Sequence, residues 1–174
     1  MNVPNTITWG RIFLTGIIVT FMIFEKYQTA FILFLIAALS DYADGYFARK
    51  LNQVTTFGKV FDQMSDKILI TSVMIIMVEK SFLPGWIVVT IVFRDTIVSA
   101  VRMTASTTGK VIAANYFGKI KTVFQMALVI GIFLQMGNLG DFYMLNTILE
   151  YVVVFFTILS GFIYVYQNRS VLKG

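Results

Sequence analysis

Four aspartates stand out in this chain of 174 residues because their spacing places them on two helix faces. Residues three, four, seven and eight positions apart lie on the same side of a helix. By this spacing, one face carries Asp41, Asp44, Gly45 and Ala48, and the other carries Gly58, Asp62 and Asp66. The connection between the two faces is short, so they can meet as an antiparallel pair. The small residues would let the backbones, or a ligand, approach closely.

Four carboxylates in so small a space cannot all stay ionised unless a cation compensates their charge. The chain has no His and no Cys, which excludes the usual zinc, haem and iron–sulfur ligands and rules out imidazole or thiol catalysis. The pattern therefore predicts a hard cation on oxygen ligands, Mg²⁺ or Mn²⁺, with enough carboxylates for two ions. Arg49 follows directly and suits a phosphate, which indicates a site for a metal-bound phosphoanhydride. The alternative is a set of interfacial aspartates paired with Lys50, Lys59 and Lys67.

A second group of residues, within 94–125, is basic. Its candidate ligand-binding cations are Arg94, Arg102, Lys119 and Lys121. A buried arginine beside basic loop residues favours an acceptor substrate that itself carries a phosphate. Two other interpretations remain open. One is positive-inside topology with lipid head-group contact, and the other is a structural ion pair between Arg94 and Asp95.

The composition indicates which elements must position these residues. Hydrophobic residues make up 57% of the chain and charged residues 13%, and the mean hydropathy is +0.79. A soluble protein of this size could not bury so much apolar surface, so we expect an integral membrane protein. The apolar runs predict a six-transmembrane-helix bundle with spans near Thr8–Phe24, Ala30–Phe47, Lys59–Val78, Trp86–Thr104, Lys119–Met136 and Leu145–Tyr166. A short amphipathic lead-in is expected over Met1–Arg11, and residues 1–174 are expected to form one domain.

The distribution of Lys and Arg predicts the orientation. With six spans, most of these residues fall on the side that holds the two termini and the aspartates, which the positive-inside rule places in the cytoplasm. The protein is therefore expected in the cell membrane, with its site at the cytoplasmic face. The formal charge of +5 suits anionic head groups and phosphorylated substrates. Nucleic acid is not an expected partner, because no basic run is interleaved with exposed aromatic residues.

The aspartate pattern resembles the signature of the CDP-alcohol phosphotransferase family at every fixed position. The matching residues read Asp41-x2-Asp44-Gly45-x2-Ala48-Arg49-x8-Gly58-x3-Asp62-x3-Asp66. The resemblance implies six transmembrane helices, a homodimer and a cytoplasm-facing site with two divalent cations. It also implies that the four aspartates hold the metals and that Asp66 doubles as general base. The residues that the resemblance assigns to the CDP-lipid are Asn5, Gly45, Ala48, Arg49 and Gly58.

The basic region resembles the phosphatidylglycerophosphate synthase branch of this family. The matching residues are Arg94, Asp95, Ser99, Arg102, Gly109, Gly118-Lys119-x-Lys121-Thr122 and Gln125. This resemblance implies transfer of phosphatidyl from CDP-diacylglycerol to sn-glycerol 3-phosphate, with release of CMP. The chain departs from the expected pattern at Gln63, at Asp95, where Glu is expected, and at Asn115, where Ser is expected. The alternatives are a phosphatidylinositol-phosphate-type or cardiolipin-type synthase and, in a different class, a divalent-cation transporter.

Overall fold

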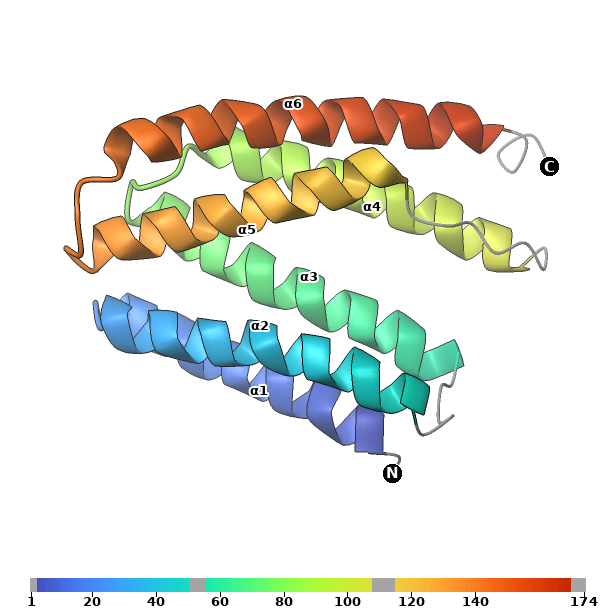
Figure 1. Cartoon of the computed structure of the whole chain (residues 1–174), viewed down its shortest axis with the longest axis horizontal. Coiled ribbons are helices and arrows are strands. Elements are labelled where there is room, and N and C mark those ends of the chain that lie inside the picture. Colours follow the sequence, from blue (N-terminus) through green and yellow to red (C-terminus); the bar gives the residue numbers. More distant parts are fainter. Residues whose placement is uncertain (1–2, 51–55, 108–114, 170–174) are drawn as a thin grey trace. The chain divides into compact units, whose positions relative to one another are not determined.

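The computed structural model of the chain is all-helical over the residues it describes (Figure 1). It describes the backbone of residues 3–50, 56–107 and 115–169, and the side chains of residues 9–40, 64–105 and 115–169. Its helices there are α1 (Val3–Ile23), α2 (Tyr27–Lys50), α3 (Thr56–Glu79), α4 (Gly85–Thr107), α5 (Tyr116–Met136) and α6 (Tyr143–Gln167). Each of the six predicted segments is helical. Most helices extend past the apolar run by about one turn, because the backbone hydrogen bonds continue into polar residues.

Helix α1 begins at Val3 and continues unbroken to Ile23. Residues 3–11 of the expected lead-in over Met1–Arg11 are therefore the first part of this helix rather than a separate element. Pro4 does not interrupt the helix because it lies in the first turn, where its missing N–H would have no partner within the helix. The position of this segment at a membrane surface stays a prediction.

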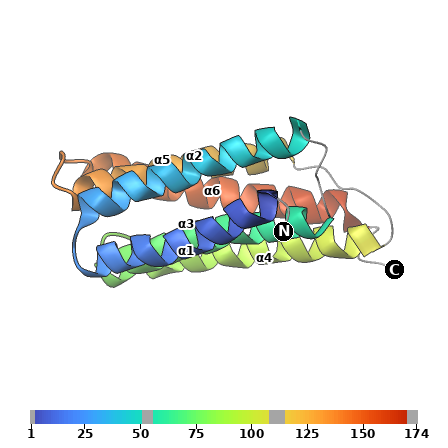
Figure 2. The ribbon, with the colours of Figure 1, turned by 90° about the horizontal axis from the view of Figure 1, so that it is seen from below.

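Helices α1 to α3 form one compact unit, Met1–Phe82, in which α1 packs against both α2 and α3. Figures 1 and 2 show these three helices running lengthwise along one another. Fully buried apolar side chains come from all three helices, among them Ile18, Met22, Phe34, Val73 and Met77. This shared apolar core fixes how α1 lies against α3, and that packing positions the residues of the site described below.

Helices α4 to α6 form the second compact unit, Leu83–Gly174, in which α6 packs against both α4 and α5. Leu128 and Ile132 of α5 and Val153 of α6 are fully buried. Phe124 and Phe156 stack with their ring centroids 5.5 Å apart. The two units are compact by themselves, and the expectation of a single domain over residues 1–174 stays a prediction.

Three helices end in the same kind of sharp turn. After α1, the Lys26 N–H donates to the Phe21 carbonyl and the Glu25 N–H to the Met22 carbonyl. This is the bonding pattern of a Schellman motif, and Glu25 takes the left-handed conformation with φ 59°. The same pattern closes α3 at Ser81 and α5 at Asn138, with φ 62° and 56°. A non-glycine residue therefore stands in the left-handed position of each turn, where the sequence carries no glycine signal.

In the part of the chain that the structure describes, two helices, α5 and α6, are long and apolar enough to cross a membrane, and shorter apolar stretches cover Trp9–Ile23 and Tyr27–Ser40. Large apolar side chains point outward as well as inward. Phe13 is 74% exposed and Phe162 is 71% exposed. Apolar side chains on the outside of apolar helices are typical of proteins that lie in lipid.

Candidate active site

The aspartates of the predicted metal site lie towards the end of one helix and near the start of the next. Asp41 and Asp44 belong to the last turns of α2, and Asp62 and Asp66 belong to the first turns of α3. The helical periodicity on which the two faces depend is thus present in both segments. The side chains of the other predicted residues, Asn5, Asp41, Asp44, Gly45, Ala48, Arg49, Gly58 and Asp62, lie outside the described residues. The meeting of the four carboxylates stays a prediction.

Asp66 is the one aspartate of this set whose side chain is described, and it meets an arginine from another helix. Arg11 Nη1 donates to Asp66 Oδ1 at 2.7 Å and to Ser65 Oγ at 3.0 Å. The Arg11 side chain is 1% exposed, whereas that of Asp66 is 41% exposed. A buried guanidinium on α1 therefore bonds to one oxygen of a partly exposed carboxylate on α3. This contact fixes the direction in which the carboxylate faces.

The donor chemistry of the predicted metal site suits a hard cation. Carboxylate oxygens are the ligands that Mg²⁺ and Mn²⁺ prefer, and the chain has no softer His or Cys ligand to compete. Among the residues with described side chains, no three acidic groups lie together, since three of the four aspartates fall outside that part. Asp66 is the described member of the set, and its side chain is partly exposed.

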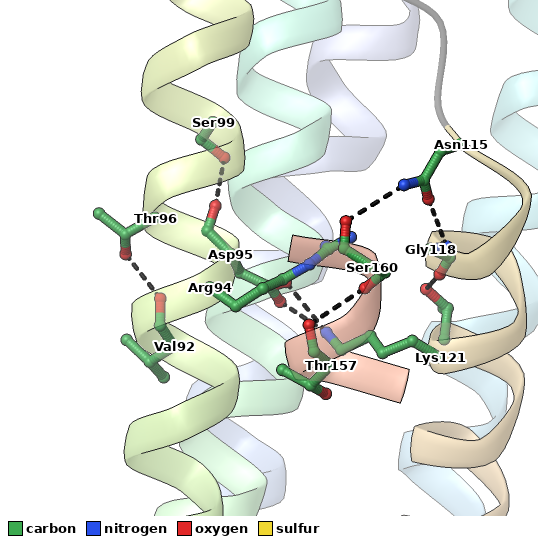
Figure 3. A network of polar contacts seen from close by, with 11 residues as sticks. Val92, Arg94, Asp95, Thr96, Ser99, Asn115, Gly118, Lys121, Thr157 and Ser160 are labelled. Carbon is green, nitrogen blue, oxygen red and sulfur yellow. Dashed lines mark hydrogen bonds and ion pairs between the residues drawn. The ribbon is translucent and has the colours of Figure 1, made fainter. Parts of the chain in front are cut away.

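In the second unit, Asp95 of α4 bonds to two of the predicted phosphate-binding cations (Figure 3). Lys121 Nζ lies 3.0 Å from Asp95 Oδ1 and 2.9 Å from Oδ2. Arg94 Nη1 donates to Oδ1 at 3.0 Å. The ion pair between Arg94 and Asp95, proposed above as the structural alternative, is therefore present, and Lys121 joins it from α5.

The other two predicted cations lie elsewhere on these helices. Arg102 is two turns beyond Arg94 on α4, and its guanidinium carbon lies 6.0 Å from the centroid of the Tyr164 ring on α6. Its Nε is buried and makes no hydrogen bond. The Tyr164 hydroxyl is also buried and also makes none. Lys119 is exposed at the start of α5. The structure thus brings Arg94 and Lys121 together but not all four cations.

Asn115, one of the departures from the expected pattern, caps α5. Its side-chain oxygen accepts a hydrogen bond from the Gly118 N–H at 2.6 Å, and its amide nitrogen donates to the Ser160 carbonyl of α6 at 3.1 Å (Figure 3). A serine side chain could accept the first bond but is too short to make both. Asn115 therefore joins the start of α5 to α6 and fixes the helix from which Lys121 extends.

Ser99 and Thr122, two of the residues that carry the branch resemblance, form hydrogen bonds within their own helices. The Ser99 hydroxyl donates to the Asp95 carbonyl at 2.8 Å, and the Thr122 hydroxyl donates to the Gly118 carbonyl at 3.0 Å. Both are bonds to the preceding turn, which hydroxyls in apolar helices commonly make. They give no support to a separate role in binding.

Two contacts escape sequence reasoning for different reasons. Arg11 is 55 residues from Asp66, and no local spacing connects them; a lone arginine entering an apolar helix is the only signal. The bond between Lys121 and Asp95 joins residues 26 apart. Here the balance of charges gave a signal, because two buried cations need an anion nearby.

Comparison with known proteins places these features in a family. Residues 1–159 match the family model described as CDP-alcohol phosphatidyltransferase. The chain is 38% identical to the CDP-diacylglycerol–glycerol-3-phosphate 3-phosphatidyltransferase of Bacillus subtilis (strain 168), over 99% of this chain and 97% of that protein. Proteins of the same name from Rickettsia felis and Mycoplasma genitalium are 32% and 34% identical, over 94% and 82% of this chain and 93% and 64% of their own lengths.

Proposed function

The chain belongs to the CDP-alcohol phosphatidyltransferase family, and we propose that it transfers phosphatidyl from CDP-diacylglycerol to sn-glycerol 3-phosphate, forming phosphatidylglycerophosphate and CMP. The observation that carries this proposal is its near full-length similarity, at 38% identity, to a protein named for that reaction. The chemistry of the two sites supports it. The aspartates suit a metal-bound pyrophosphate, and the basic cluster suits an acceptor that bears a phosphate.

The proposal places all six helices across the cell membrane, with both termini and the aspartates at the cytoplasmic face. The apolar character of α5 and α6 and the outward apolar side chains support a membrane position. In this topology most Lys and Arg would lie on the cytoplasmic side, and the loops with the sharp turns at Glu25, Ser81 and Asn138 would lie on the opposite side. The homodimer that the family resemblance implies is part of this proposal.

Asp41, Asp44, Asp62 and Asp66 would hold two divalent cations, Mg²⁺ or Mn²⁺, which when bound neutralise charge on the pyrophosphate and on the departing CMP. Asn5, Gly45, Ala48, Arg49 and Gly58 would contact the CDP-lipid. Small residues at three of these positions would let the nucleotide approach the backbone, and Arg49 would supply a fork of donors to a phosphate. Arg11 and Ser65 keep one oxygen of Asp66 in place.

The proposed step is a single displacement. Asp66 accepts the proton of the acceptor hydroxyl as the hydroxyl oxygen bonds to the phosphatidyl phosphorus. The bond from that phosphorus to the CMP oxygen breaks, and its electron pair leaves with CMP. The chain has no His or Cys to act as a covalent nucleophile, which favours direct transfer.

The acceptor phosphate would be bound by four cations that differ in their contacts: Arg94, Arg102, Lys119 and Lys121. Arg94 and Lys121 already share one carboxylate, and Arg94 Nε makes no hydrogen bond. Two cations around a single anion leave positive charge for a phosphate. Arg102 and the exposed Lys119 extend the positive region along α4 and at the start of α5.

The test is release of CMP by the purified protein in lipid vesicles containing CDP-diacylglycerol and Mg²⁺. Glycerol 3-phosphate, inositol phosphate, inositol, serine and phosphatidylglycerol are offered one at a time, with and without a chelator. We expect chelator-sensitive release with glycerol 3-phosphate alone. The variant Asp141→Asn, in the turn before α6, is the matched control and should match the wild type. Release with only another acceptor would overturn the acceptor assignment, and cation flux without any CMP release would favour the transporter.

A further inference from the structure

Asp95 is a partly buried anion at a place where a phosphate-binding site would be expected to exclude one. A carboxylate repels a phosphate, so its presence beside Arg94 and Lys121 weakens binding unless it contributes something else. It accepts hydrogen bonds from both cations, through Oδ1 from Arg94 and through both oxygens from Lys121. Its own side chain is 21% exposed. The arrangement is a carboxylate that fixes two cations from two helices.

Lys121 illustrates what this carboxylate contributes. A lysine ammonium ends a flexible four-carbon stem and adopts many positions when nothing holds it. Here the side chain is 3% exposed, and its Nζ lies about equally far from the two oxygens of Asp95. A bond to both oxygens restricts the ammonium to one place. Without it, a buried cation would lack its counter-charge and would move towards water.

Arg94 is restricted by shape as well as by charge. A Cβ at position 161 of α6 would lie 2.9 Å from Arg94 Cγ, and a Cβ at position 118 of α5 would lie 3.1 Å from Arg94 Nη2. Both distances are shorter than ordinary van der Waals contact. Gly161 and Gly118 therefore leave the space through which the arginine side chain extends, with Asp95 at its end. The guanidinium has few other positions to adopt.

We propose that Asp95 is a positioning residue for the acceptor, which fixes Arg94 and Lys121 in the arrangement that recognises its phosphate. This inference deepens the proposed function and rests on it. Arg94, Lys121 and Asp95 together carry a net positive charge, and this charge is available to the phosphate. The carboxylate also keeps the two donors from rearranging when the acceptor leaves. The gain is preorganisation, since the acceptor does not have to order two long side chains.

The experiment compares Asp95→Asn, Asp95→Glu and the wild type in CMP release, measuring KM for glycerol 3-phosphate and KM for CDP-diacylglycerol separately. We expect Asp95→Asn to raise the acceptor KM by about tenfold or more and to leave the CDP-diacylglycerol KM within about twofold. Asp95→Glu keeps the charge and should recover most of the loss. The control is Glu150→Gln, which removes a partly buried carboxylate on a different helix, α6. It should behave as the wild type.

Two results would overturn the proposal. If Asp95→Asn lowers the KM for glycerol 3-phosphate, the carboxylate competes with the phosphate for the two cations and does not position them. If both KM values change equally, or if only the thermal unfolding temperature falls, Asp95 stabilises the helices without acting on the acceptor.

A second variant covers the case in which Asp95→Asn does not fold. Gly161→Ala keeps every charge but pushes Arg94 Cγ from its place. It should raise the acceptor KM selectively, whereas Gly16→Ala, where an added methyl meets nothing, should not. An acceptor KM unchanged by Gly161→Ala would count against the positioning of Arg94.

A binding measurement separates failure of this inference from failure of the proposed function. Inorganic phosphate should raise the thermal unfolding temperature of the wild type, and Asp95→Asn should lose that shift. A phosphate shift in a protein that does not use glycerol 3-phosphate would overturn the proposed reaction and keep the positioning role. The same phosphate shift in Asp95→Asn and the wild type would overturn the positioning role whatever the acceptor.

Discussion

The two polar clusters of this protein have opposite charge balance. In the first unit, one arginine, Arg11, bonds to Asp66, a member of a group of four aspartates. In the second unit, one carboxylate, Asp95, bonds to two cations, Arg94 and Lys121. The group of minority charge, Arg11 at 1% exposed and Asp95 at 21% exposed, bonds in each case to described members of the majority. Under the proposed function, the charge left over would attract a cation in the first case and an anion in the second.

The comparison also shows how orientation is achieved in each unit. Arg11 is almost fully buried and presents its fork to a carboxylate that stays 41% exposed. Lys121 is almost fully buried too, but there the positioned group is itself the cation. In both cases the positioning group comes from another helix, α1 for Asp66 and α4 for Lys121, but Asp95 also bonds to its neighbour in the sequence, Arg94. Breaking each cluster should therefore affect a different substrate.

The largest effect should come from Asp66→Asn. The change removes the proposed base while keeping the side-chain shape, so we expect turnover to fall by about 10²–10⁴-fold. Binding of the CDP-lipid should persist, as measured by protection of the protein against thermal unfolding. Full turnover in this variant would refute the assignment of Asp66 as the base.

Removing the group that holds Asp66 should have a smaller effect. Arg11→Met keeps the length of the side chain but loses both hydrogen bonds, and a displaced catalytic group costs up to about 10²-fold in rate. The acceptor KM should stay near the wild-type value, because the basic cluster is intact. Lys26→Met, an exposed cation in the same unit, serves as the control. A rise confined to the acceptor KM would contradict the separation of roles between the two clusters.

Arg102→Ala tests whether Arg102 takes part in acceptor binding together with Arg94 and Lys121. Arg102 packs against Tyr164 and lies away from the Asp95 triad, so its contribution should be smaller than that of Arg94. We expect a rise of about three- to tenfold in the acceptor KM, with the KM for CDP-diacylglycerol unchanged. Equal changes in both KM values would make Arg102 a structural residue.

Asn115→Ser separates the cap of α5 from its bridge to α6. Serine can still cap the helix, but it loses the bond to the Ser160 carbonyl, so stability should fall by about 0.5–1.5 kcal/mol. Asn115→Ala loses both bonds and should cost about 1 kcal/mol more. Thermal unfolding in one detergent measures both, and equal stability of the two variants would show that the cap contributes little.

The smallest effect should come from the exposed pair between Glu25 and Lys80, whose N···O distance is 2.8 Å. The hydrogen bond from Lys80, and then its charge, lower the pKa of Glu25 from 4.5, and the hydrogen bond to Glu25 raises the pKa of Lys80 from 10.5. The pair therefore stabilises the fold fully between these two values. Its contribution is lost as pH falls through the lowered pKa of Glu25 or rises through the raised pKa of Lys80.

The measurement for this pair is the thermal unfolding temperature of Lys80→Met against the wild type from pH 3 to pH 8. The difference should be small at neutral pH, should vanish in acid and should shrink at about 1 M salt. Lys26→Met, beside the same turn, is the matched control. A difference that persists unchanged in acid would mean that packing of the Lys80 stem, not the ion pair, stabilises the turn.

Much of this architecture could be predicted from the sequence, because the apolar runs show approximately where each helix begins and ends. The six helices and the pairing of Arg94 with Asp95 follow from patterns within a few residues. The contact between Arg11 and Asp66 could not be predicted, since it depends on how α1 packs against α3. The left-handed turn at Glu25 was equally hidden, because the tertiary packing of α1 and α2 sets it and no glycine marks it.

The different surroundings of the four predicted cations could not be predicted either, for the same reason. A shared helical stripe brings Arg94 and Arg102 to one side of α4, but eight residues of helix separate them by about 12 Å. The packing of α6 then directs Arg102 to Tyr164, whereas Asp95 draws Arg94 and Lys121 together. Periodicity predicts the face on which a side chain lies but not its partner across the unit.

The most direct test of the separation between the two clusters is the discrimination between glycerol 3-phosphate and glycerol by Arg94→Met. This variant leaves Asp95 paired with Lys121, so the partly buried carboxylate keeps a counter-charge. The measured quantity is the ratio of kcat/KM for the two acceptors, at saturating CDP-diacylglycerol. If the basic cluster recognises the acceptor phosphate, the ratio should fall by about 10- to 100-fold, with the KM for CDP-diacylglycerol unchanged. An unchanged ratio would contradict the account, because Arg94 would then serve only the packing of α4 to α6.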